Sequence, residues 1–127
     1  MMESQSKRKP QAVLQRGDIV LVPFPFTDLT AEKLRPAVIV STDPQKTDVT
    51  IAFISSVGSP EELSATDYLL RQDNPDFART GLKKVSTFRM RKLLTIERSK
   101  IIRRLGRASP AIQEELDIRL RQAVGLQ

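Results

Sequence analysis

Two segments decide the fold of this chain, 16-RGDIVLVPFPF-26 and 34-LRPAVIVS-41, which are joined by the polar stretch 27–33. Residues 19–22 are apolar without interruption, which is typical of a buried strand, and residues 37–40 repeat that pattern. Pro23 and Pro25 have no N–H to donate to a neighbouring strand, so the first strand must leave the sheet there or follow its edge. These segments therefore predict two strands with a loop between them.

Further strand patterns follow along the chain. Residues 49–55 alternate and then run apolar, which predicts a third strand antiparallel to 37–40. A short strand is expected over 67–70, and a longer one begins near Leu82 and reaches Leu94. Residues 100–105 are expected to form a short helix before Gly106. The pattern as a whole predicts a mainly β domain.

The last element is predicted to be a helix that starts at Pro110. Ser109 suits the N-cap position, and proline is favoured at the first helical position because it needs no N–H there. Ile112, Leu116 and Leu120 recur at helical spacing and form one apolar stripe that would face a sheet. The chain is therefore expected to be mainly β with a C-terminal helix.

The composition limits the possible chemistry. A chain of 127 residues is long enough for one domain with its own core, and we assign 1–15 to a flexible arm and 16–127 to the domain. The chain has no Cys and no His, which excludes disulfides, a thiolate nucleophile and an imidazole base, and we expect no metal site. No apolar run approaches the length of a membrane span, so the cytoplasm is the expected location.

The positive charge is concentrated in one part of the chain. The formal net charge is +6, yet residues 83–107 hold ten basic residues and a single acid, Glu97, a local excess of +9. The rest of the chain therefore carries −3. A localised basic region predicts a polyanionic partner.

Three motifs give the chain a family resemblance. They are Gly17-Asp18-Ile19-Val20, Pro23-Phe24-Pro25-Phe26-Thr27-Asp28 and Leu34-Arg35-Pro36-Ala37-Val38-Ile39-Val40-Ser41. Together they resemble the opening of the MazF/PemK toxin family. The resemblance implies an SH3-like barrel of the PemK/CcdB toxin type and a sequence-specific endoribonuclease that cleaves single-stranded RNA without a metal or cofactor. It also implies a homodimer that is neutralised by a cognate antitoxin protein.

Arg35 and Ser55 are the catalytic candidates. Pro36 holds Arg35 in an extended backbone at the entrance of a strand, where its guanidinium can meet phosphate oxygens in a bidentate manner. The alternative for Arg35 is a solvated charge or an ion pair with Asp28 or Glu32. In the resembled family a strand ends in Ile-Thr or Ile-Ser with its hydroxyl facing the scissile phosphate, and Ile54-Ser55 occupies that place. The alternative for Ser55 is a hydroxyl bonded to neighbouring backbone.

Four basic residues are the candidates for RNA binding. Strand alternation places Arg89 and Arg91 on one face and Met90 on the other. Lys92 follows them in the basic region, and Lys33 immediately precedes the strand that carries Arg35. These four residues are expected to contact the RNA backbone.

Some alternatives stay open. Asp18, Asp28 and Glu32 are the candidates for the general base of a reaction in which the 2′-hydroxyl attacks phosphorus and leaves a 2′,3′-cyclic phosphate. An SH3-like barrel could also hold nucleic acid or a partner without cutting it, or act as a gyrase-targeting toxin of the same fold. The expected dimer interface draws on apolar residues near the basic segment, Leu93, Leu94, Ile96, Ile101, Ile102 and Leu105.

Overall fold

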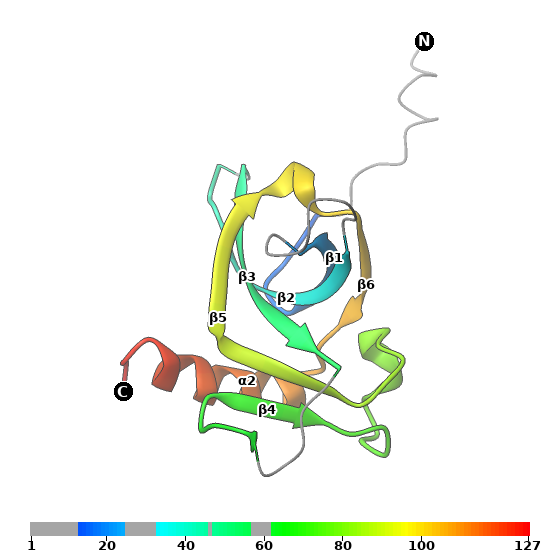
Figure 1. Ribbon diagram of the computed structural model, residues 1–127. Helices are drawn as coiled ribbons and strands as arrows, with labels where there is room; N and C mark the ends of the chain where they lie inside the picture. The colour runs from blue at the N-terminus through cyan, green and yellow to red at the C-terminus, as the bar shows by residue number, and fades with distance from the viewer. Residues whose placement is uncertain (1–12, 25–32, 46, 57–61) are drawn as a thin grey trace.

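A single curled antiparallel sheet dominates the computed structural model, which describes residues 13–24, 33–45, 47–56 and 62–127 (Figure 1). The strands of this sheet are β1 (Asp18–Pro23), β2 (Leu34–Thr42), β3 (Asp48–Ser55), β4 (Asp67–Leu70), β5 (Ser86–Glu97) and β6 (Arg103–Arg107). They pair in the order β4-β5-β3-β2-β1-β6, so the sheet forms a half-barrel. Helix α2 (Pro110–Ala123) follows the last strand. The predicted mainly β class with a C-terminal helix is confirmed.

The central strands are buried on both faces. Ile19 and Val38 lie in a cluster on the side of helix α2, which we call the helix-side cluster, together with Phe88 and Leu116. Their chain neighbours point the other way into an opposite-face cluster, formed by Val20, Val22, Ala37, Ile39, Val49, Ile51 and Phe53. Since successive side chains of a strand alternate between faces, a strand that is buried on both faces must be apolar at every position. This is why residues 19–22 and 37–40 are uninterrupted apolar runs.

Helix α2 begins as the sequence predicts. The Oγ of Ser109 accepts a hydrogen bond from the backbone N–H of Ile112 at 3.1 Å, and Pro110 is the first helical residue. Ile112 and Leu116 are buried in the helix-side cluster, and Leu120 packs against it. The apolar stripe of α2 therefore packs against one face of the sheet, over strands β4 and β5.

The short helix expected over 100–105 is wrong. A 3₁₀ turn, η3 (Arg98–Lys100), is followed by strand β6, which pairs with β1 in antiparallel register. The N–H of Ile102 donates to the carbonyl of Leu21 at 2.8 Å and leads the chain into that pairing. Pairing with the free edge of β1 satisfies backbone groups that a helix would have left exposed.

The apolar side chains assigned to a dimer interface are mostly used within the chain. Leu93 and Leu105 pack against the helix-side cluster, and Leu94, Ile96 and Ile101 pack against the opposite-face cluster. Ile102 is the exception, with 53% of its surface exposed. The excess of apolar residues near the basic segment is therefore no evidence for an interface.

The chain ahead of β1 is fastened to the domain. Leu14, which the sequence assigned to the arm, packs against the opposite-face cluster, and the N–H of Gln15 donates to Asp18 Oδ2 at 2.8 Å. The Asp18 carboxylate is 1% exposed and pairs with Arg104 at 3.3 Å and Arg107 at 3.1 Å. Asp18 thus joins β1 to β6, and its carboxylate is engaged in holding these two strands together.

Candidate active site

Arg35 and Ser55 line the same cavity. This cavity, which we call the catalytic cavity, has a volume of about 230 Å³ and lies between β2, β3 and β5. Its lining residues are Phe24, Arg35, Phe53, Ile54, Ser55, Arg89 and Lys92. Two catalytic candidates and two RNA-binding candidates from distant parts of the sequence therefore meet at one place.

The Arg35 guanidinium is held by an aromatic ring. Arg35 is the second residue of β2, opposite Val22 of β1, so it lies inside the strand and not ahead of it. Its guanidinium carbon lies 5.3 Å from the centroid of the Phe24 ring, and that ring meets Phe53 edge to face at 5.3 Å. The Nε atom is buried and has no hydrogen-bond partner among the described residues. The Phe24 ring thus fixes the position of the Arg35 guanidinium, and its Nε–H remains available to donate a hydrogen bond to an anion.

Ser55 and Ser56 lie on different cavities. Ser55 is the last residue of β3, pairs with Thr87 of β5 and lines the catalytic cavity. Ser56 lines a separate cavity of about 330 Å³. Of these two serines, Ser55 is therefore the one that shares a cavity with Arg89 and Lys92.

A wide bulge in β5 presents the basic residues. Ala52 of β3 pairs with Leu93, but Ile54 pairs with Phe88, so four β5 residues stand opposite the single residue Phe53. These four residues are Arg89, Met90, Arg91 and Lys92. Figure 1 shows β5 changing direction near α2. A bulge of this kind bends the strand and redirects its side chains.

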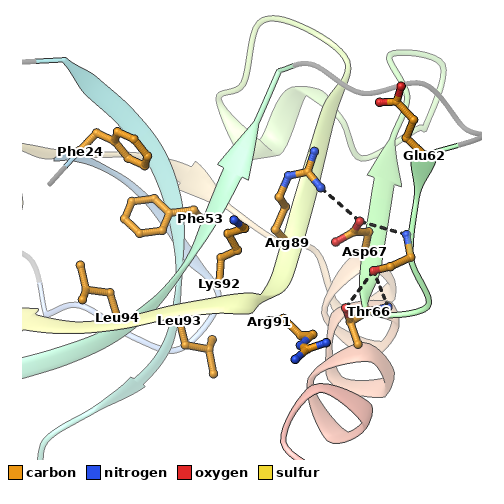
Figure 2. A pocket seen from close by; sticks show the side chains of 11 residues that line it. Phe24, Phe53, Glu62, Thr66, Asp67, Arg89, Arg91, Lys92, Leu93 and Leu94 are labelled. Carbon is orange, nitrogen blue, oxygen red and sulfur yellow. Dashed lines mark hydrogen bonds and ion pairs between the residues drawn. The ribbon is translucent and has the colours of Figure 1, made fainter. Parts of the chain in front are cut away.

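The bulge residues extend the site into a larger cavity. That cavity, of about 600 Å³, shares Phe24, Phe53, Arg89 and Lys92 with the catalytic cavity and adds Arg91. Met90 is 2% exposed and packs in the helix-side cluster, so the predicted alternation of this segment is observed. The opposite wall carries polar side chains from the chain around β4, and Figure 2 shows Glu62, Thr66 and Asp67 there. Ser64 also lines this cavity. Because the two cavities share four lining residues, they adjoin one another, and we call them together the basic groove.

The remaining candidates lie elsewhere. Lys33 is exposed, its carbonyl accepts from the N–H of Phe24 at 2.8 Å, and its side chain lines none of these three cavities. Asp18, one of the candidate bases, is committed to Arg104 and Arg107 as described above. Asp28 and Glu32 lie outside the described residues.

The described residues hold no metal-binding cluster of three or more acidic, His or Cys side chains. Within the same part of the chain, no helix has both the length and the apolar character that a membrane span requires.

Comparison with known proteins places the chain in a family. Residues 15–124 match the family model of the PemK-like, MazF-like toxin of type II toxin–antitoxin systems. The chain belongs to this toxin family. No curated protein matches the sequence. The half-barrel thus has the fold that the resemblance implied.

Solved structures share the fold of this family member at low sequence identity. An endoribonuclease of a mycobacterial species, solved with its cognate antitoxin, has a TM-score of 0.70 and 16% identity over 91% of this chain and 98% of its own. The toxin MazF-mt6 of Mycobacterium tuberculosis has a TM-score of 0.67 and 21% identity, over 87% of this chain and 98% of its own. A chain of MazE–MazF from Deinococcus radiodurans has a TM-score of 0.67 and 18% identity, over 91% of this chain and 99% of its own.

Sequence reasoning missed Asp67 and the aromatic contacts of the toxin's groove. Phe24 and Phe53 are far apart in the sequence, and their edge-to-face contact depends on the β1–β2–β3 pairing. Asp67 is an acid in the first position of a short strand, and its ion pair with Arg89 follows from the β4–β5 register. No local pattern reports either feature.

Proposed function

We propose that this toxin is a metal-independent, sequence-specific endoribonuclease that cleaves single-stranded RNA. The observation that carries the proposal is that Arg35 and Ser55 line one cavity with Arg89 and Lys92. A guanidinium, a hydroxyl and two further cations at one place suit a phosphodiester with charge developing on its oxygens.

The proposed reaction needs no covalent intermediate with the protein. A base removes the proton of the RNA 2′-hydroxyl as its oxygen bonds to the adjacent phosphorus, and the bond from phosphorus to the 5′-oxygen breaks. The 5′-oxygen takes up a proton, so the products are a 2′,3′-cyclic phosphate and a free 5′-hydroxyl. Arg35 stabilises the extra negative charge on the non-bridging oxygens, and the Ser55 hydroxyl donates to one of them. Arg89 and Lys92 hold the backbone in place for in-line attack. No carboxylate of the described residues lines the catalytic cavity, so Asp28 and Glu32 remain the candidates for the base.

Incubation of the purified protein with a long single-stranded RNA in EDTA tests this proposal. We expect a limited set of cuts, each with a 2′,3′-cyclic phosphate on the upstream fragment. The Arg35→Ala protein, purified in the same way, controls for contaminating nucleases. Cleavage that stops in EDTA and returns with Mg²⁺ would contradict the mechanism. Binding without any product would instead support a barrel that holds RNA without cutting it.

We also propose a homodimer and an acidic antitoxin as partners. The cavity of about 330 Å³ shares Arg35 with the catalytic cavity and has an apolar lining that includes Leu82 and Leu105. Lys83, Lys84 and Arg103 also line it. An acidic, disordered segment with apolar anchors would match this surface and would compete with RNA.

Sedimentation equilibrium tests the assembly. The toxin alone should sediment at twice its chain mass of 14.3 kDa, and a stable monomer at micromolar concentration would refute the dimer. The antitoxin segment should raise the apparent Kd for RNA linearly with its own free concentration. An antitoxin that binds without changing RNA affinity would exclude competition for the groove.

A further inference from the structure

The Asp67 carboxylate is buried at the wall of a groove that otherwise attracts anions. Its side chain is 7% exposed, and it lines the larger cavity beside Arg89, Arg91 and Lys92. A buried negative charge at this place repels phosphate and must be compensated by hydrogen bonds. It therefore lowers the affinity of the groove for RNA, which calls for an explanation.

The explanation lies in the contact with Arg89. Asp67 and Arg89 face one another across the β4–β5 pair, and Arg89 Nη1 donates to Asp67 Oδ2 at 3.2 Å (Figure 2). The same oxygen accepts from the N–H of Ser64 at 3.1 Å, which fixes the carboxylate. Arg89 starts within the β5 bulge, where regular pairing with β3 is interrupted. The fixed Asp67 carboxylate therefore orients the Arg89 side chain at a place where β5 is not held by β3.

Helix α2 fixes the backbone of Asp67 in turn. Arg119 Nε donates to the Asp67 carbonyl at 2.8 Å, and Arg119 Nη1 pairs with Glu115 at 2.7 Å. The Arg119 guanidinium also lies 5.0 Å from the centroid of the Tyr68 ring. Burial, followed by the Glu115 charge, raises the pKa of Tyr68, so this phenol stays neutral at physiological pH. The carboxylate that holds Arg89 is thus anchored through its own peptide group to the C-terminal helix.

Asp67 acts through Arg89 and not on the substrate. Arg89 lines both cavities, whereas Asp67 lines only the larger one and is absent from the lining of the catalytic cavity. We propose that Asp67 is a positioning residue, which holds the Arg89 guanidinium toward the RNA phosphate during cleavage. This inference rests on the proposed nuclease function.

The Asp67→Asn variant separates positioning from simple attraction. The amide keeps the shape of the side chain and one accepting oxygen but removes the negative charge. We expect kcat to fall about tenfold, within the roughly 10²-fold that a 1 Å misplacement can cause. KM for a short single-stranded RNA should stay equal or fall, because a repulsive charge has been removed. If Arg89 only attracts RNA and needs no orientation, Asp67→Asn should leave kcat unchanged and raise kcat/KM.

A double-variant cycle provides the control. In an Arg89→Ala background, Asp67→Asn should cause no further loss of kcat, because there is no guanidinium left to orient. Asp67→Glu, which restores the charge, should recover part of the loss. A loss of the same size in both backgrounds, together with a lower Tm, would reveal a purely structural residue and overturn the proposal.

The same assays distinguish failure of the positioning role from failure of the proposed nuclease function. If the parent protein cleaves RNA and Asp67→Asn cleaves with the same kcat, the positioning role is wrong and the nuclease stands. If the parent protein cleaves no RNA, the proposed function fails and the positioning role fails with it.

Discussion

Replacing Arg35 by alanine should slow RNA cleavage by about 10²- to 10³-fold, the usual cost of removing one group that stabilises transition-state charge. The Arg35 guanidinium can meet two phosphate oxygens at once, and unlike the Arg89 guanidinium it is not held by a carboxylate of the described residues. Single-turnover cleavage of a defined RNA, with parent and variant at the same concentration, measures the effect. Arg35→Lys should recover only part of the rate, since an ammonium cannot make the bidentate contact.

The same substitution should leave the fold intact. Arg35 stacks on Phe24 at the boundary of two cavities, and its buried Nε has no hydrogen-bond partner among the described residues. Truncation therefore removes an unsatisfied polar group. Arg121→Ala, on the last turn of α2, removes the same charge away from the groove and should cleave as the parent does. An Arg35→Ala protein that cleaves at the parental rate would remove Arg35 from the mechanism. One that unfolds would make it a structural residue.

Ser55→Ala should reduce cleavage by about 10²-fold, at the lower end of the same range, because the lost donor is neutral. Ser56 lies on the other cavity, so the neighbouring hydroxyl has no route to the same phosphate oxygen. The loss should appear in kcat with little change in KM, since the hydroxyl acts where charge develops. The measurement is the same single-turnover assay.

Two neighbouring variants check the assignment. Ser55→Thr keeps the hydroxyl and should retain activity, and Ser56→Ala should stay close to the parent. If Ser56→Ala is the slower of the two alanine variants, the serine that serves the phosphate has been misassigned. If neither variant is slow, the hydroxyl has no catalytic role.

Features that a strand carries in its own residues could be predicted from the sequence. The runs 19–22 and 37–40 are apolar throughout because both faces of β1 and β2 are buried, and Ser109-Pro110 marks the start of α2. Arg35 and Ser55 could be named because the motifs around them resemble those of the toxin family, whereas the proline after Arg35 and the strand end at Ser55 alone would not have assigned them a role. That the two residues share a cavity depends on the β2–β3 pairing.

Features that arise from pairing between distant strands could not be predicted from the sequence. Residues 100–105 contain nothing that reveals the free edge of β1, so β6 was mistaken for a helix. The bulge at Arg89–Lys92 is a mismatch between two registers, and each register is set by residues outside the bulge. The Asp67–Arg89 ion pair depends on the β4–β5 register, which no local pattern in the sequence reveals either.

The β5 bulge also has an evolutionary consequence. Because pairing with β3 is regular up to Phe88 and again from Leu93, a residue gained or lost between these points would leave both flanking registers unchanged. The cations at the exposed end of the bulge, Arg91 and Lys92, can therefore vary between descendants while the pairing with β3 is kept. Two bulge residues are constrained by the fold, since Met90 is buried in the helix-side cluster and Arg89 pairs with Asp67. New target preferences would therefore arise at small cost in stability only at Arg91 and Lys92.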